Sequence, residues 1–350
     1  QRIVAARQAN PDMRVVVIDP RRTTTCDLAD IHLQLSPGSD GFLFAGLFEF
    51  LRAGDYIDRA FVEAHTEGLE RALAAVGDLV LSEVSFRTGL SLEQLLEFYE
   101  LFATTERTVT LYSQGINQSA TGTDKCNAII NCHLLTGRVG RPGMGPFSIT
   151  GQPNAMGGRE VGGLANQLAA HMDFTPQDVD RVGRFWGAKD MATAPGLKAV
   201  DMFRAAAEGK IRFMWILATN PAVSLPDTEL VRRALERCEF VVVSDCSADT
   251  DTAAYADLLL PAAPWGEKDG TVTNSERCIS RQRALQPLSG QARPDWWAIT
   301  QVAHRLGHQA AFPYCSQADV FREHAALSAF ENEGRRAFDI GALAHRDDEN

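Results

Sequence analysis

The stretch 212–245, RFMWILATNPAVSLPDTELVRRALERCEFVVVSD, decides the fold class of this chain. Residues 212–217 and 240–243 each predict a strand. Residues 227–236, which lie between them, predict a helix. Because neighbouring parallel strands are joined by crossover helices, this order predicts a doubly wound α/β fold.

The same alternation continues on both sides of this stretch. A helix is expected at 199–208 and a short strand at 258–260. No internal repeat or low-complexity tract interrupts the pattern. Toward the N-terminus we expect strands at 15–18, 31–35 and 109–112, and helices at 1–8, 41–53, 58–66, 68–76, 91–104, 124–135 and in the stretch that ends at His171.

Residues 137–163, GRVGRPGMGPFSITGQPNAMGGREVGG, are the least regular part of the sequence and hold nine of its 28 glycines. Glycine is favoured where the backbone takes a positive φ or approaches another group closely. The alternative is a flexible linker, but Phe147, Ile149, Met156 and Val161 give the stretch more apolar content than linkers usually carry. We therefore expect an ordered loop that packs against a large ligand.

Polar residues follow three of the predicted strands, where parallel α/β sheets bind their ligands. They are Asp19-Pro20-Arg21-Arg22-Thr23 with the later Gly38-Ser39-Asp40, then Thr219-Asn220-Pro221-Ala222, and then Ser244-Asp245. An aspartate accepts two N–H donors from a guanine edge, while arginine and backbone amides hold phosphate oxygens. The alternatives are a helix cap with a surface ion pair for the first group and a simple turn for the second.

The segment 265–277, WGEKDGTVTNSER, contains Lys268, one of only five lysines among 34 cationic residues. A lysine can meet a phosphate as a point charge, and Gly270 permits a close approach. Lys125 is a second candidate for the same reason, because lysine is rare in this chain and Lys125 lies inside another motif-like segment. The alternative for 265–277 is a solvated charged turn.

Composition narrows the functional class. The formal net charge of −11 argues against a nucleic-acid partner and fits a cytoplasmic enzyme. No apolar run approaches the roughly 18 residues of a membrane span. The seven cysteines form no CxxC pair, so they predict neither a disulfide framework nor a metal centre, and we expect mostly buried, reduced thiols.

Residues 145–163, GPFSITGQPNAMGGREVGG, resemble the signature loop of assimilatory nitrate reductases. These belong to the molybdenum enzymes that hold the metal between two molybdopterin guanine dinucleotides. The resemblance covers nearly the whole chain and implies two doubly wound parallel-sheet domains of the molybdopterin oxidoreductase type, incomplete at both ends. The implied divisions are the end of a first cofactor-binding domain (1–110), a second one containing the glycine-rich loop (111–270), and a segment (271–350) that connects to a missing C-terminal domain.

The resemblance also implies the residues of the site. His133 and His171, both expected in helices, are interpreted as structural, and no residue here is expected to ligate the metal. Contacts to one pterin dinucleotide are implied for Asp19, Pro20, Arg21, Arg22, Thr23, Gly38, Ser39, Asp40, Gln114 and Gln118. Contacts from the second sheet are implied for Asn220, Ser244, Asp245, Lys268 and Asp295, and positions nearest the metal for Thr150, Gln152, Met156 and Arg159.

The chain departs from the family pattern because it lacks the cysteines that bind the cluster and the metal. The cysteines for a [4Fe-4S] cluster and the cysteine that ligates molybdenum belong upstream of Val15, so we expect a central part of the enzyme, inactive alone, from which upstream sequence has been cut. The intact enzyme would reduce nitrate with electrons from a donor protein. The last forty residues, which end in RDDEN, are expected to be a connector.

Three rival functions follow from the same resemblance. Formate dehydrogenases typically carry an arginine where this chain has Thr150, and periplasmic-type nitrate reductases carry one near Thr121. Both absences favour the assimilatory type. A non-catalytic electron-transfer scaffold of the same ancestry keeps the fold without the pterin. Against it counts the joint presence of Asp19, Asn220, Asp245 and Lys268.

Overall fold

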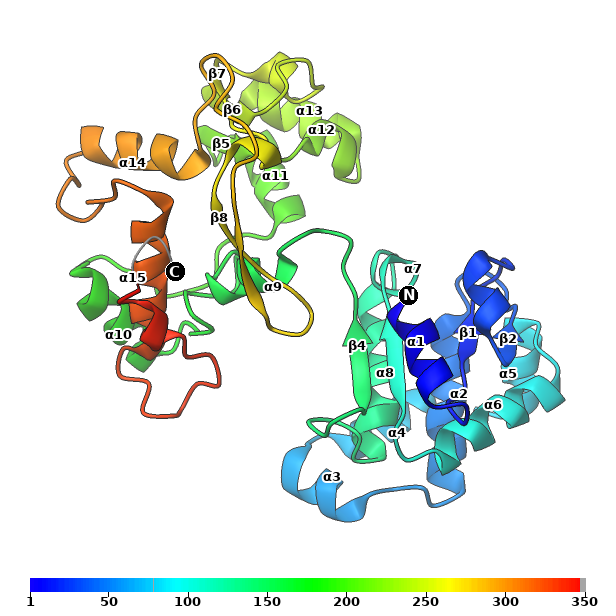
Figure 1. The fold of residues 1–350 in the computed structure, drawn as a ribbon. Coiled ribbons are helices and arrows are strands. Elements are labelled where there is room, and N and C mark those ends of the chain that lie inside the picture. Colours follow the sequence, from blue (N-terminus) through cyan, green and yellow to red (C-terminus); the bar gives the residue numbers. More distant parts are fainter. Residues whose placement is uncertain (78, 347–350) are drawn as a thin grey trace. The chain divides into compact units, whose positions relative to one another are not determined.

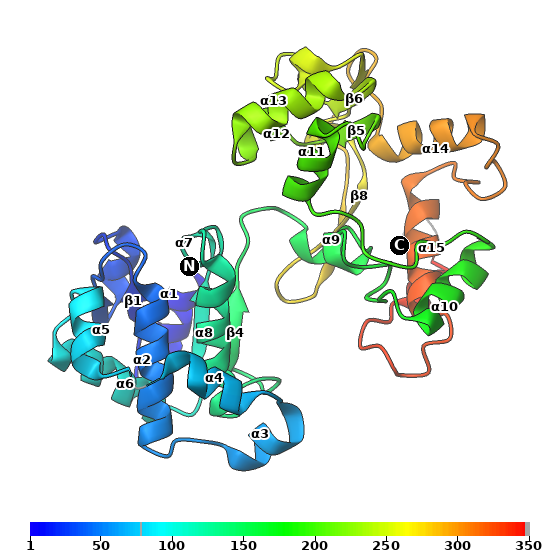
Figure 2. The same ribbon diagram turned by 180° about the vertical axis from the view of Figure 1, so that it is seen from behind.

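The chain divides into two units, Gln1–Gly151 and Gln152–Asn350. The computed structural model describes residues 1–77 and 79–346, and Figure 1 and Figure 2 show the two units from opposite sides. No helix in the described part is both long and apolar enough to cross a membrane.

Unit 1 is built on two pairs of parallel strands. Strand β1 (Val16–Ile18) pairs with β2 (Ile31–Leu33), and β3 (Val109–Tyr112) pairs with β4 (Gly145–Ser148). Helices cover these strands: α1 (Arg2–Ala9), α2 (Asp40–Ala53), α3 (Arg59–His65), α4 (Leu69–Val76), α5 (Leu81–Thr88), α6 (Leu92–Thr104), α7 (Gln114–Asn117), α8 (Gly122–Leu135) and the 3-10 turn η1 (Thr24–Leu28).

The core of unit 1 forms around α2, whose leucines and phenylalanines recur on one face and pack against α8, α5 and α6. Leu43, Leu47 and Leu95 are fully buried. Tyr99 of α6 is buried too, and its hydroxyl donates to the carbonyl of Leu43 at 2.7 Å. This packing fixes the N-terminus of α2, to which Gly38–Asp40 lead.

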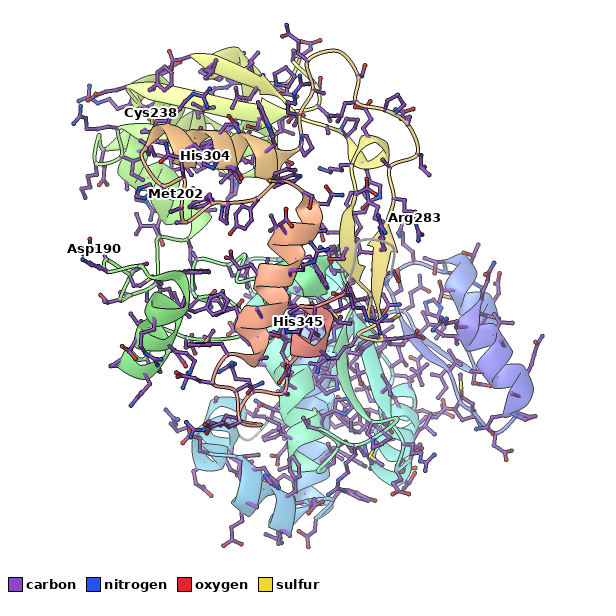
Figure 3. The ribbon with its side chains drawn as sticks, turned by 60° about the vertical axis from the view of Figure 1, so that its left-hand side comes forward. Asp190, Met202, Cys238, Arg283, His304 and His345 are labelled. Atoms are coloured by element: carbon purple, nitrogen blue, oxygen red, sulfur yellow. The ribbon has the colours of Figure 1, made fainter. Side chains whose placement is uncertain are left out.

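Unit 2 contains the alternating helices and parallel strands that the sequence predicts. Strands β5 (Phe213–Leu217), β6 (Phe240–Asp245) and β7 (Leu258–Pro261) are parallel, in that spatial order. Helices α11 (Ala199–Ala207) and α13 (Thr228–Arg237) pack against each other, and their apolar residues join Ile216, Val241 and Val243 in one core. Met202 and Cys238, labelled in Figure 3, belong to the same cluster.

A second part of unit 2 is arranged around an antiparallel hairpin of β8 (Gly270–Thr273) and β9 (Ile279–Gln282). Helices α9 (Ala155–Glu160) and α15 (Gln317–Ala329) both contact β8. The other elements are α10 (Pro176–Trp186), α12 (Pro221–Ser224), α14 (Asp295–Arg305), η2 (Ala253–Tyr255), η3 (Trp265–Glu267) and η4 (Gly341–Leu343).

The predicted fold class is confirmed, and the predicted strands lie where expected within a few residues. The helix expected to end at His171 is wrong: that stretch consists of turns, and Ala170 and His171 have positive φ. The amide of Ala170 donates to the carbonyl of Glu160 at 2.9 Å. Because this bond folds the chain back after α9, the stretch forms turns instead of a helix.

The glycine-rich stretch is ordered but is not only a loop, since it contains β4 and α9. The expected connector also differs, because its described part carries α15, and its residues 347–350 lie outside the described residues. The cysteines are free as expected but not mostly buried: Cys26, Cys132 and Cys238 are buried, whereas Cys246, Cys278 and Cys315 are exposed. The domain divisions at 110 and 270 remain a prediction.

Candidate functional sites at the strand ends

The carboxyl ends of β1 and β2 bring the first predicted segment into an ordered turn. The Asp19 carboxylate accepts from the backbone amide of Arg21 at 2.7 Å, and the Asp19 amide donates to the carbonyl of Leu33 at 3.2 Å. The Pro20 carbonyl accepts from Gln34 Nε2 at 2.9 Å. These bonds fix the turn, while the side chains of Arg21 and Arg22 remain exposed beyond the sheet. Asp19 itself forms no ion pair within the described residues, but the alternative interpretation holds for other members of the group, because exposed Arg22 lies 3.8 Å from Asp27 and Ser39 is the N-cap residue of α2.

The segment 38–40 lies at the start of α2 and is tied into the protein. Ser39 is buried, and its hydroxyl donates to the carbonyl of Ser36 at 2.6 Å. Asp40 forms an ion pair with Lys125 of α8 at 3.0 Å, and Lys125 is 5% exposed. Gly38 has φ +85° and open space where a Cβ would point. Thus Gly38 offers backbone to a ligand, whereas the Asp40 carboxylate already has a partner.

The ends of β3 and β4 bring Gln114 close to the glycine-rich stretch. Ser113, before Gln114, donates its hydroxyl to the carbonyl of Ile149. A Cβ on Gly151 would lie 3.3 Å from Gln114 Nε2. Gln114 and Thr150 therefore lie at the same edge of unit 1, and Gln118 follows α7 with an exposed side chain.

In unit 2 the ends of β5 and β6 carry Asn220, Ser244 and Asp245, as predicted. Asn220 Oδ1 accepts from the hydroxyl of buried Thr252 at 2.6 Å and from its amide at 3.1 Å. Ser244 is buried, and its hydroxyl accepts from Trp215 Nε1 at 2.8 Å. These two side chains hold the sheet edge together, which the sequence did not reveal.

Asp245 connects this edge to Lys268 and Asp295. Its carboxylate accepts from the amide of Ser247 at 3.0 Å, and its carbonyl accepts from the amide of Ala262. Ala262 forms a parallel bridge with Arg293, two residues before Asp295. The structure therefore brings Asp245 and Asp295, distant in sequence, to one edge of unit 2.

Lys268 and Asp295 meet directly, with Lys268 Nζ 3.4 Å from Asp295 Oδ2. Asp295 Oδ1 is buried and has no hydrogen-bond partner within the described part of the chain. The preceding residue of the segment, Glu267, is buried and accepts from the amide of Ser289 at 3.0 Å. The 265–277 segment is therefore anchored at its start and continues as β8, while its last residues, 274–277, form an exposed turn.

Of the four residues predicted nearest the metal, three lie in unit 2 and Thr150 lies in unit 1. Gln152 is exposed before α9, Met156 is half-buried on α9, and Arg159 is exposed on α9. The Arg159 backbone carbonyl accepts from the amide of Gly162 at 3.1 Å, but its guanidinium has no hydrogen bond or ion pair to another residue within the described part of the chain. Its guanidinium is available to an anion.

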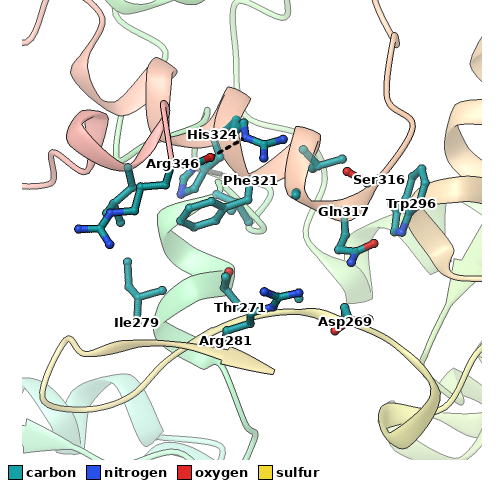
Figure 4. Close-up of a pocket in the computed structure, with 16 residues that line it drawn as sticks. Asp269, Thr271, Ile279, Arg281, Trp296, Ser316, Gln317, Phe321, His324 and Arg346 are labelled. Atoms are coloured by element: carbon teal, nitrogen blue, oxygen red, sulfur yellow. Dashed lines mark hydrogen bonds between the residues drawn. The ribbon is translucent and has the colours of Figure 1, made fainter. Parts of the chain in front are cut away.

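A cavity of about 620 Å³ lies between the β8–β9 hairpin and α15, and no sequence pattern indicated it. Figure 4 shows Thr271, Ile279 and Arg281 on the hairpin side, and Phe321 and His324 on the helix side. Burial lowers the pKa of His324 below its ordinary value, and nearby Glu160 opposes this shift.

The two histidines interpreted as structural make contacts inside their own units. His133 of α8 is fully buried, and its Nε2 lies 2.7 Å from the Thr110 hydroxyl. Burial, together with the charge of Arg138, lowers the pKa of His133 to about 4. His171 packs edge-on against Phe338.

Parallel sheets with charged and amide side chains at their carboxyl ends are typical of ligand-binding α/β proteins. The family described as Molybdopterin oxidoreductase matches residues 1–305 of this chain. The chain therefore belongs to the molybdopterin oxidoreductase family.

Relatives in this family include nitrate reductases. A nitrate reductase of Klebsiella oxytoca is 56% identical over 98% of this chain, which spans 39% of that protein. The assimilatory nitrate reductase catalytic subunit of Bacillus subtilis is 34% identical over 88% of the chain and 44% of its own length. An F420-dependent formate dehydrogenase subunit alpha of Methanocaldococcus jannaschii is 32% identical over 91% of the chain and 46% of its own length.

Among solved structures, acetylene hydratase from Pelobacter acetylenicus superposes with a TM-score of 0.69 at 21% identity, over 95% of this chain and 48% of that one. This similarity concerns the fold. The chain thus spans less than half the length of the curated relatives described above.

Proposed function

We propose that this chain belongs to a molybdenum nitrate reductase of the assimilatory type, in which it holds a bis(molybdopterin guanine dinucleotide) cofactor. The chemistry that this cofactor supplies is two-electron oxygen-atom transfer, which converts nitrate to nitrite. The proposal is supported by the 56% identity to a nitrate reductase over nearly the whole chain.

The chemistry of the residues at the strand ends fits a pterin dinucleotide. Asp295 Oδ1 is a buried acceptor without a partner in the described chain, and an N–H group of a pterin or guanine would satisfy it. Arg21 and Arg22 are exposed cations beside ordered backbone, which suits phosphate oxygens. Gly38 and Gly270 leave open space where a side chain would intrude.

In this proposal each unit binds the cofactor through its own strand ends. Asp19 accepts from a guanine edge with the oxygen that Arg21 does not engage, and Gln114, Gln118 and the 20–23 backbone bind the same dinucleotide. In unit 2, Lys268 and Asp295 bind as a pair, while Asn220 and Ser244 mainly keep the sheet edge in shape.

The observation that carries the choice of nitrate over formate is the side chain at position 150. Formate oxidation needs a fixed cation for the carboxylate, and an arginine before Gly-Gln supplies a bidentate one in formate dehydrogenases. Thr150 offers a hydroxyl and no charge. In this proposal, Arg159 supplies the positive charge that holds nitrate.

The test of the cofactor assignment is Asp19→Ala in the complete enzyme. Loss of a charge-assisted hydrogen bond to guanine, about 1.5 to 3 kcal/mol, predicts at least tenfold weaker retention of guanine nucleotide and molybdenum. Asp12→Ala is the matched control, since Asp12 is an exposed carboxylate nearby. Full occupancy in both variants would refute the assignment.

The remaining components of the proposal lie outside this chain. In this proposal, cysteines upstream of Val15 would hold a [4Fe-4S] cluster, which would supply electron transfer from a donor protein, and the enzyme would work in the cytoplasm. Iron analysis and localisation of the complete protein test these points.

A further inference from the structure

Helix α9, which carries Met156 and Arg159, cannot hold its position by itself. It has six residues, and helices this short are unstable without tertiary contacts. Glycines at 157 and 158 weaken it further. Its orientation must therefore come from contacts with other elements.

One residue of β8 binds both ends of α9. The backbone amide of Thr273 donates to Asn154 Oδ1 at 2.8 Å, at the N-terminal cap of the helix. The Thr273 hydroxyl donates to Glu160 Oε2 at 2.8 Å, at the last helical residue. Thr273 and Glu160 are each 6% exposed. A hydrogen bond from a hydroxyl to a buried carboxylate is stronger than one between neutral groups.

Gly157 makes the first of these bonds possible. A Cβ at position 157 would lie 2.1 Å from Asn154 Oδ1, so only glycine leaves room for the Asn154 side chain to fold over the helix. Asn154 itself has φ +63°, a conformation that asparagine tolerates better than most residues. The Asn154 and Gly157 positions of the glycine-rich stretch thus serve the contact with β8.

We propose that Thr273 is a positioning residue, which together with Asn154 and Glu160 fixes α9 so that Met156 and Arg159 are presented in one orientation. Thr273 acts through the helix and touches neither substrate nor cofactor. The inference rests on the proposed function for its consequence in catalysis, but the contact itself stands on the geometry of unit 2.

Hydrogen–deuterium exchange of this chain tests the contact directly. The amides of Gly158 and Val161 bind carbonyls within α9, to Asn154 and Gly157. In Thr273→Val, which removes the hydroxyl but keeps the branched shape, we expect these amides to exchange at least tenfold faster. Thr273→Ser should exchange like the wild type, as should Ser280→Ala, which removes an exposed hydroxyl from β9. Wild-type exchange in Thr273→Val, or equally fast exchange in Thr273→Ser, would overturn the inference.

Kinetics of the complete enzyme test the consequence. Misplacing a binding group by about 1 Å can cost about a hundredfold in rate, so Thr273→Val should lower kcat for nitrate by about ten- to a hundredfold. KM should change less than kcat, molybdenum content should stay unchanged, and Thr273→Ser should restore the rate. A loss of molybdenum in proportion to activity would contradict a positioning role. If the wild-type enzyme does not reduce nitrate, the proposed function fails, and the exchange experiment still decides the contact.

Discussion

The two units each contain a lysine–carboxylate pair. The pairs differ in the distance between the two charges and in how far their side chains are exposed to solvent. In unit 1, Lys125 and Asp40 lie 3.0 Å apart, with side chains 6% and 16% exposed. In unit 2, Lys268 and Asp295 lie 3.4 Å apart, with side chains 29% and 27% exposed. Asp295 also keeps one buried oxygen without a partner in the described chain.

This difference separates a structural pair from one that can receive a ligand. The charge of Lys125 is neutralised by Asp40 inside the protein, where an unpaired charge is costly. The Lys268–Asp295 pair is looser and leaves an acceptor unsatisfied, which fits a site completed by a bound group. The sequence drew equal notice to both lysines, because lysine is rare in this chain.

The largest expected effect comes from removing the buried charge. Lys125→Met should lower the free energy of unfolding by about 3 kcal/mol, since the half-buried carboxylate of Asp40 is left without its cation. Adding Asp40→Asn should recover part of this loss. Lys268→Met, the same substitution in the looser pair, should cost less than about 1 kcal/mol. Denaturant unfolding of the wild type, the two single variants and the double variant measures these free energies. Equal losses of stability in Lys125→Met and Lys268→Met would contradict the proposed difference between the two pairs.

A second prediction extends the structural role of α8 to His133. Its pKa is about 4 in the folded protein, below the ordinary 6.5. The unfolded chain therefore binds this proton first, so stability is full above pH 6.5 and falls as the pH drops toward 4. Each pKa unit is worth about 1.4 kcal/mol, so the loss reaches about 3 kcal/mol at pH 4.

The check is denaturant unfolding between pH 7 and pH 5 for the wild type and His133→Gln. The variant should be less stable at pH 7 but should lose less stability on acidification. Parallel pH profiles of the two proteins would show that His133 does not titrate as stated.

The smallest effect on stability and the clearest one on ligand binding are expected at Lys268. In the complete enzyme, Lys268→Met should reduce molybdenum and guanine nucleotide retention about tenfold, a loss of about 1.4 kcal/mol. Lys125→Met, measured per folded molecule, should retain more cofactor than Lys268→Met. If Lys125→Met retained less cofactor than Lys268→Met, the result would indicate that the ligand binds at the Lys125–Asp40 pair instead.

The sequence predicted the parallel strands because their apolar β-branched runs are local features, as in 240–243. The family resemblance placed Lys268 and Asp295 among the implied cofactor contacts; their side chains lie 3.4 Å apart in the structure, and their cofactor role stays a prediction. It failed at the helix ending at His171, because the fold of that stretch depends on the bond from Ala170 to the carbonyl of Glu160. Hydrogen bonds between distant segments of the chain produce no periodic pattern of apolar residues in the sequence.

For the same reason the sequence did not show which predicted site residues already have protein partners. Asp40 is engaged by Lys125, and Ser244 by Trp215, 85 and 29 residues away. The contact of Thr273 with α9 spans 113 residues to Glu160. The cofactor roles of the predicted residues remain predictions that the variants above test.

The central claim is tested most directly by steady-state kinetics of the complete enzyme with nitrate and with formate. We predict nitrate reduction with a reduced viologen donor and negligible formate oxidation, because Thr150 provides no fixed cation for a carboxylate. Thr150→Arg should impair nitrate turnover by crowding the site. If the wild-type enzyme oxidises formate faster than it reduces nitrate, the functional claim is contradicted, while the family assignment stands.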